Sequence, residues 1–381
     1  MIVQIGIKPN KQFVFYIVVI LSMVGMVWFG VNNGGQSGHG HHEDVSFLPG
    51  RVVEVVEDRT SLNAAGARVG SQALRIRLLS GSRRGDIIEA NNILFPIEHA
   101  VYAQVGQRLL VFFEQHLGAA DYDYFSHVQS HDRSIAIYII VILFFGLLAA
   151  VFGKTGIKSA FSLVFTFVVL IFLLLPLITG GGPPALLTML LSLCIIVVSL
   201  IAIMGFEKKT WVSIAGTSLG ILFYSVFYGL ISAALRITGF NVQEVDMLIV
   251  AGFDASVGEL LFCAILIASL GALMDVAVSL ASVMAELSET NKNMKASALF
   301  RSGMKIGRDI IGSSANTLIL AFTGTFFITL ILFNINNFQY AVLINRVDMG
   351  IEVLRAISAT AAMVLCAPAT VLIGSYVFAK K

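Results

Sequence analysis

Charged residues are scarce in this chain. Aspartate, glutamate, lysine and arginine make up 13% of its 381 residues, 57% are hydrophobic, and the mean hydropathy is +0.87. A soluble domain of this length needs far more charge to cover its surface, so the composition indicates a polytopic membrane protein. The lipid bilayer is therefore the first partner that we expect.

The apolar segments also lack the residues on which many reaction centres depend. All seven histidines lie before residue 132, at positions 39, 41, 42, 99, 116, 127 and 131. This placement excludes zinc, haem and serine–histidine chemistry based on imidazole from the long apolar segments. No Walker-type phosphate loop occurs, and the three cysteines (Cys194, Cys263 and Cys366) lie singly in apolar surroundings. We therefore expect no enzymatic activity, no catalytic residue, no cofactor and no bound metal.

The chain begins with an apolar run over residues 12–31, which follows two lysines. A charged start and an apolar core also fit a signal peptide, but the run is long and no cleavage site follows it cleanly. We interpret residues 1–31 as an uncleaved anchor helix. Residues 32–47 are rich in glycine and histidine and are expected to form a flexible tether, with weak metal binding as the alternative.

Residues 48–130 differ in composition from the rest. Short β-branched runs such as GRVVEVVED and ALRIRLLS partly alternate and are separated by turn clusters, which is typical of antiparallel strands. We predict a small β-barrel or sandwich of about five strands with OB-like topology. Arginines are numerous here, but acidic residues are interspersed and no aromatic platform is apparent, so no nucleic-acid partner is expected.

Seven further apolar runs are each long enough to cross a bilayer core of about 30 Å. They lie at about 134–152, 157–179, 184–205, 210–235, 257–285, 309–333 and 351–378. With the anchor they predict eight transmembrane helices, seven of them in a membrane domain over residues 131–381. Lysine and arginine concentrate in alternate loops. The positive-inside rule therefore places both termini in the cytoplasm and residues 32–133 on the extracytoplasmic side.

Polar residues recur at helical spacing in two of these segments. One helix face carries Gly271, Asp275, Ser279, Ser282 and Glu286. A face in the next segment carries Arg308, Asp309, Gly312, Ser313, Asn316 and Thr317. Because lipid cannot satisfy such groups, we expect the two faces to turn inward, toward each other or toward a water-filled cavity.

Three motifs have a recognisable pattern: GALMDVAVSLASVMAE (271–286), LFRSGMKIGRDIIGSSANTLILAFTG (299–324) and a final segment with Glu352, Arg355 and APAT (367–370). They resemble the YibE/F-like family of bacterial multi-pass membrane proteins. The resemblance covers roughly residues 50–378. It implies an integral protein of the bacterial inner membrane without an assigned activity, for which a permease role is the expectation.

The polar groups define a candidate transport pathway. It comprises Asp275, Ser279, Ser282, Arg308, Asp309, Ser313, Asn316, Thr317, Glu352 and Arg355. Asp275 is either a proton or cation site or the partner of Arg308 in a structural ion pair. Glu352 and Arg355 are expected to form an interfacial salt bridge. An intramembrane aspartyl protease would need a Gly-x-Gly-Asp context, which neither Asp275 nor Asp309 has.

The leading hypothesis is a permease for an unidentified ion or small solute, proton-linked through Asp275. The alternative is a non-transporting scaffold or envelope-assembly protein that docks partners through its outward β-domain. The basic stretch 286–308 is expected to lie as an amphipathic helix on anionic lipid or to receive a protein partner.

Overall fold

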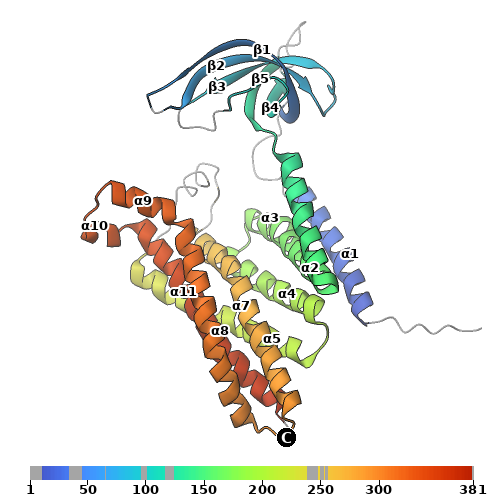
Figure 1. The fold of residues 1–381 in the computed structure, drawn as a ribbon, viewed down its shortest axis with the longest axis vertical. Coiled ribbons are helices and arrows are strands. Elements are labelled where there is room, and N and C mark those ends of the chain that lie inside the picture. The colour runs from blue at the N-terminus through green and yellow to red at the C-terminus, as the bar shows by residue number, and fades with distance from the viewer. Residues whose placement is uncertain are drawn as a thin grey trace, which may run out of the picture. The chain divides into compact units, whose positions relative to one another are not determined.

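The computed structural model describes residues 11–33, 45–64, 66–95, 101–115, 124–237, 248, 253 and 256–379. These residues form two compact units. One is a β-barrel unit within residues 38–147, and the other is a helical unit from the described parts of residues 1–37 and 148–381 (Figure 1). Most of the predicted histidine-rich tether, residues 34–44, lies outside the described residues.

Five strands close into a small barrel. They are β1 (Val45–Leu62), β2 (Arg68–Leu78), β3 (Ile87–Leu94), β4 (Arg108–Gln115) and β5 (Tyr124–His131). The strand order is β1-β2-β3-β5-β4, in which only the β3–β5 pair is parallel. Alternate residues of β3, such as Ile88 and Leu94, are buried, as the two-residue period of a strand requires. The prediction of a small five-stranded β-barrel is confirmed.

Two amide side chains are buried in the barrel. Gln72 on β2 and Asn92 on β3 are each 2% exposed. Asn92 Nδ2 donates to Gln72 Oε1 (2.9 Å) and to the carbonyl of Val101 (2.6 Å), while Gln72 Oε1 accepts from the Ala103 amide (2.9 Å). The network ties residues 101–103 to β2 and β3 and satisfies polar groups that are costly to bury alone.

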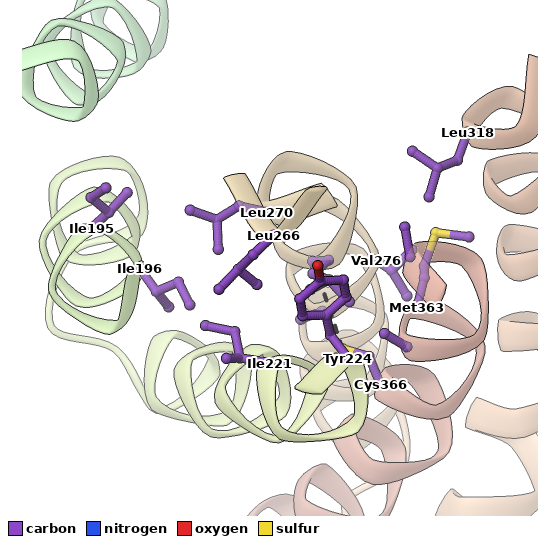
Figure 2. Close-up of a cluster of buried hydrophobic side chains, with 14 of the residues drawn as sticks. Ile195, Ile196, Ile221, Tyr224, Leu266, Leu270, Val276, Leu318, Met363 and Cys366 are labelled. Carbon is purple, nitrogen blue, oxygen red and sulfur yellow. Dashed lines mark hydrogen bonds between the residues drawn. The ribbon is translucent and has the colours of Figure 1, made fainter. Parts of the chain in front are cut away.

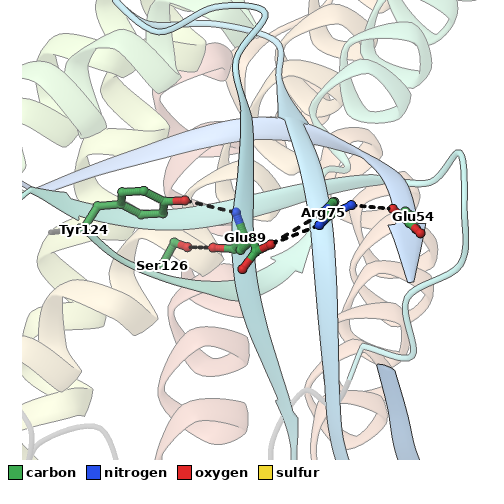
Figure 3. Close-up of polar contacts among 5 residues, drawn as sticks. All are labelled: Glu54, Arg75, Glu89, Tyr124 and Ser126. Atoms are coloured by element: carbon green, nitrogen blue, oxygen red, sulfur yellow. Dashed lines mark hydrogen bonds and ion pairs between the residues drawn. The ribbon is translucent and has the colours of Figure 1, made fainter. Parts of the chain in front are cut away.

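Acidic partners accompany the arginines on the outside of the barrel. Arg75 of β2 lies between Glu54 of β1 (3.1 Å) and Glu89 of β3 (3.4 Å), as Figure 3 shows. The main-chain amide of Glu89 donates to Tyr124 Oη (3.2 Å), and its carbonyl accepts from Ser126 Oγ (2.5 Å), so β3 is fastened to β5. Exposed pairs of this kind contribute at most about 1 kcal/mol each. Their main effect is to neutralise the arginine.

The remaining elements are helices. They are α1 (Lys11–Asn33), α2 (Ser134–Val169), the π-helix η1 (Leu170–Leu174), α3 (Leu175–Thr179), α4 (Pro184–Met204), α5 (Lys208–Leu235), α7 (Val257–Thr290), α8 (Ala296–Thr325), α9 (Phe327–Ile335), α10 (Tyr340–Ile344) and α11 (Val347–Phe378). By length and composition alone, six helical stretches in the described residues could cross a membrane, or seven if α8 and α9, bent by 56°, form one span. These long apolar helices are compatible with a multi-pass membrane protein.

The count of six is lower than the predicted eight for two reasons. The predicted segment 309–333 is broken between α8 and α9, and the predicted segments 134–152 and 157–179 form one helical run, Ser134–Thr179. Within the run, Gly153 has non-helical angles (φ 56°, ψ −129°). A Cβ added to Gly156 would collide with the carbonyl of Leu148. In a straight helix these two residues would lie about 12 Å apart along the axis. The run therefore turns back on itself at Gly153.

α7 lies at the centre of the helical unit, in contact with α4, α5, α8 and α11. Figure 2 shows Leu266 and Leu270 of α7 among buried side chains of the neighbouring helices. Tyr224 of α5 is fully buried there, and its hydroxyl donates to the carbonyl of Phe262 on α7 (2.8 Å). The Tyr224 ring thus adds apolar contact area, and its hydroxyl has a hydrogen-bond partner although it is buried.

Small residues bring α5 and α11 close together. Thr370 of α11 occupies the space that a side chain at Gly216 would need, and a Cβ added to Gly220 would lie 3.2 Å from Cys366 Cβ. Cys366 Sγ lies 3.3 Å from the Gly216 carbonyl. Cys366 is fully buried and packs in this seam as a small apolar side chain.

α1 makes specific contacts with other helices of the same unit. Tyr16 Oη donates to the carbonyl of Ala202 at the end of α4 (2.7 Å). A Cβ added to Gly30 would lie 2.6 Å from the carbonyl oxygen of Phe172 in η1, so only glycine permits this approach. The helix therefore contacts the helical unit near both of its ends, and most of its remaining surface is exposed.

Asp132 joins β5 to the first turn of α2. It accepts hydrogen bonds from the amide (3.1 Å) and the hydroxyl of Ser134, it pairs with Arg108 (2.9 Å), and its side chain is 5% exposed. The hydrogen bonds from Ser134, helped by those from Arg108 and its charge, hold the pKa of the Asp132 carboxyl below its ordinary value.

The buried amide network leads to a first prediction. Asn92→Ala removes the donor to Gln72 and Val101, and should destabilise the barrel by about 1–3 kcal/mol because two buried acceptors each lose a hydrogen bond. Hydrogen exchange of peptides from β2 and β3 measures the change. Asn91→Ala, at the exposed neighbouring position of the same strand, is the control. Equal losses in the two variants would contradict the role of the network.

A second prediction concerns pH. A carboxylate whose pKa is lowered by folding stabilises the folded state above its unfolded pKa, and this stability is lost as the pH falls through the folded pKa. Exchange protection of β4 and β5, corrected for the intrinsic rate, should therefore be constant near neutral pH and fall with acidification below the ordinary aspartate range. Asp132→Asn should abolish this loss of protection on acidification, whereas the exposed Asp86→Asn should retain it. An unchanged acid profile in Asp132→Asn would contradict the assignment.

Candidate functional site

Asp275 lies on an exposed stripe of α7. The exposed residues of the stripe are Ala264, Ala268, Gly271, Asp275, Ser279 and Glu286, and Ser282 is partly buried beside them. The other sides of α7 are buried against α4, α5, α8 and α11. The polar face predicted for residues 271–286 is therefore present, and it points away from the other described helices.

α8 has an exposed face of the same character. It carries Arg301, Lys305, Arg308, Asp309, Gly312, Ser313, Asn316 and Thr317. The buried side of α8 consists of Leu299, Gly303, Gly307, Leu318 and Phe322. We refer below to the exposed residues of α7 and α8 named here together as the polar face.

α7 and α8 contact each other beside the polar residues. A Cβ added to Gly307 of α8 would lie 3.3 Å from Leu280 Cδ2 of α7, and Gly303 lies against Met284 of α7 and Val371 of α11. The expectation that the two polar faces turn toward each other is therefore wrong for the described chain, and the alternative of a water-filled cavity stays a prediction. The glycines let apolar side chains fill the seam, and the polar residues stay at its outer edge.

No ion pair organises this edge in the part of the chain that the structure describes. Asp275, Arg308 and Asp309 have neither a hydrogen-bond partner nor a salt-bridge partner there, so the alternative of an Asp275–Arg308 pair is not formed within the chain. Thr317 Oγ1 donates to the carbonyl of Ser313 on its own helix (3.0 Å). The described residues also contain no group of three or more His, Cys, Asp or Glu that could hold a metal ion.

Glu352 and Arg355 lie one turn apart on α11. Arg355 Nη1 is 3.3 Å from Glu352 Oε2, and the two side chains are 30% and 12% exposed, respectively. The expected pair is thus formed. Oε1 of Glu352 is buried and has no hydrogen-bond partner among the described residues. This carboxylate is consequently more buried than any acidic group of the polar face.

The basic stretch is not a single helix. α7 continues to Thr290, and α8 begins at Ala296 after a short turn, which corrects the predicted amphipathic helix over 286–308. Leu299 is fully buried, so the first turns of α8 pack on the helical unit, whereas Arg301 and Lys305 are exposed. The spacing of Leu299, Gly303 and Gly307 at every fourth residue is the sequence signal of this buried side.

The barrel carries an aromatic cluster, which corrects the expectation that no aromatic platform exists. Phe47, Phe112 and Phe125 are neighbours on the adjacent strands β1, β4 and β5, and Phe112 stacks on His127 with ring centroids 4.6 Å apart. Phe47 and Phe125 are 54% and 52% exposed. These residues are far apart in the sequence, and the strand register brings them together.

Comparison with known protein families gives one finding. The model of the family described as YibE/F-like protein matches residues 140–380, which include α4, α5, α7, α8 and α11. Comparison with curated proteins and with solved structures gives no match.

The buried pair on α11 leads to a third prediction. Arg355→Met leaves the buried Glu352 carboxylate without its partner and should destabilise the helical unit by about 3 kcal/mol. Glu352→Gln in the same chain should restore much of that loss, because no charge is then stranded. Unfolding of the four forms in detergent gives the coupling energy. A double variant no more stable than Arg355→Met would show that the two side chains act independently.

Proposed function

We propose that this chain, which belongs to the YibE/F-like family, is a permease-like protein of a bacterial inner membrane that moves an ion or small solute. The observation that supports this function is the polar face, with Asp275, Arg308, Asp309 and Asn316 exposed on α7 and α8. Ionisable side chains within spans are costly in lipid and mark ion or substrate pathways.

The proposed topology has eight spans. The run Ser134–Thr179 contains 46 residues, about 69 Å of helix, which is more than twice the thickness of a bilayer core. Its reversal at Gly153 supports two spans, and α8 with α9 supplies one bent span. Lys154 and Lys158 follow the reversal directly. Under the positive-inside rule, they support cytoplasmic termini and an extracytoplasmic β-barrel.

Asp275 is the proposed site of proton or cation binding. In this topology it lies inside the span α7, several turns from the cytoplasmic end at Thr290. Arg308 and Asp309 lie closer to the cytoplasmic side on α8. The hydroxyl and amide groups of Ser279, Ser313 and Asn316 provide oxygen ligands or hydrogen bonds along the face. Glu352 and Arg355 on α11 organise the outward end.

A fourth prediction tests transport directly. Proteoliposomes on a solid-supported membrane, exposed to jumps in H⁺, Na⁺ or K⁺ concentration, should give a charge-displacement current for at least one of the ions. Asp275→Asn should abolish this current while the protein remains folded, because the neutral amide cannot load and release a positive charge. Glu289→Gln, an exposed carboxylate at the end of the same helix, should leave the current unchanged.

Two results would contradict the proposal. One is the absence of current above that of protein-free liposomes for all three ions. The other is an equal current in Asp275→Asn and the unchanged protein. Circular dichroism and gel filtration of Asp275→Asn separate loss of transport from loss of fold.

A second candidate function is a non-transporting scaffold that docks envelope partners through the barrel. The aromatic cluster of Phe47, Phe112 and Phe125 favours it, because exposed aromatic side chains are enriched where proteins bind each other. In a scaffold the charge-displacement current would be absent. Asp275→Asn would then be tolerated or would weaken only the packing of the helices.

A further inference from the structure

The exposed surface of α7 differs from that of the other candidate spans. From residue 256 to residue 318, no large hydrophobic side chain is exposed, although α7 has an apolar stretch long enough to cross a membrane. α5 instead exposes Leu222, Val226 and Leu230, and exposed apolar side chains are also found on α1, α2, α4 and α11. The surface of α5 is suited to lipid, whereas the surface of α7 is not.

The polar face also carries charges without partners. Asp275, Arg308 and Asp309 are exposed and unpaired within the described chain. An ionised side chain facing the centre of a bilayer costs roughly 2.5–3.5 kcal/mol on insertion scales. A helix surface with several such groups therefore needs a cover of protein or water in the membrane.

The contacts between α7 and α8 show which residues of the two helices lie at the same height along the helix axes, which we call the same level. Gly307 lies against Leu280, and Gly303, four residues earlier, lies against Met284, four residues later, so the helices are antiparallel. Extending this register along both helices relates the exposed positions. Glu286 is level with Arg301, Asp275 is level with Gly312, and Gly271 is level with Asn316.

We propose that a second copy of this chain covers the polar face, related by a two-fold axis along the membrane normal. Such an axis keeps every residue at its own level and places α7 of one copy against α8 of the other. Glu286 then faces Arg301 of the partner subunit. Asp275 lies about one helical turn from Arg308 of the partner subunit, within reach of its long side chain. Ser279 and Ser282 supply hydroxyl donors for Asp309 of the partner subunit.

Charge complementarity selects a second copy as the occupant. The exposed charges of α7 are all acidic, and those of α8 in its cytoplasmic half are mostly basic, at levels that match across the axis. A two-fold interface needs this self-complementarity, since the same surface serves on both sides. Ala264, Ala268, Gly271 and Gly312 leave room for close approach of the helices. The interface does not depend on transport, because a scaffold could use it equally.

Disulfide cross-linking in native membranes tests the dimer. Cys194, Cys263 and Cys366 are first replaced by alanine, and two differently tagged copies are co-expressed. One copy carries Gly271→Cys on α7, and the other carries Asn316→Cys on α8, so a mixed disulfide can form only between copies. Oxidation should give severalfold more mixed product than the control pair Leu222→Cys and Val226→Cys on the apolar surface of α5. Equal yields from the two pairs would overturn the proposal.

A charge exchange between copies tests the register. Glu286→Arg in one copy should reduce the mixed product, because it would face Arg301 of the partner subunit. Arg301→Glu in the other copy should restore it, since the opposite charges are again level. Failure of the second change to restore cross-linking would overturn the proposed pairing. The readout is independent of ion movement, so its outcome is separate from that of the transport assay.

Discussion

Hydrocarbon cannot accept or donate hydrogen bonds, so every polar group of the helical unit that lies in the membrane needs a partner from protein or water. Inside the unit it is met by backbone pairing and by local contacts such as Tyr224 Oη to the Phe262 carbonyl. On the polar face it is not met, because Asp275, Arg308 and Asp309 have no partner within the described chain. The proposed transport pathway and the proposed second copy are both argued from that deficit.

The position of the polar face depends on how α7 is held. Tyr224 and the seam of Gly216, Gly220 and Cys366 fix α5, α7 and α11 together, and Gly303 and Gly307 bring α8 onto α7 and α11. These contacts use the apolar sides of α7 and leave one stripe uncovered. A continuous polar surface thus results from apolar packing on the other sides of the same helices. The match of the YibE/F-like family to residues 140–380 covers this whole arrangement.

Composition and periodicity predict the elements well, because each depends on residues close in sequence. The β-barrel follows from alternation in stretches such as ALRIRLLS, and the polar residues of α7 and α8 follow from helical spacing. Helical spacing shows that these residues share one side of a helix. It does not show which other element, if any, lies against that side. The spacing of Leu299, Gly303 and Gly307 does carry the missing information, because it identifies the buried side of α8. The aromatic cluster at Phe47, Phe112 and Phe125 depends on strand register between distant segments, so no local pattern reveals it.

The central claim is that lipid does not cover the polar face. Spin labels at Ala268, Gly271 and Ser279 of α7, and at Leu222, Val226 and Leu230 of α5, test it in bilayers through their collision rates with oxygen, which concentrates in hydrocarbon. The account predicts low oxygen accessibility at the three α7 positions and high accessibility at the three α5 positions. Equally high accessibility on both helices would mean that lipid contacts α7, and would contradict the claim.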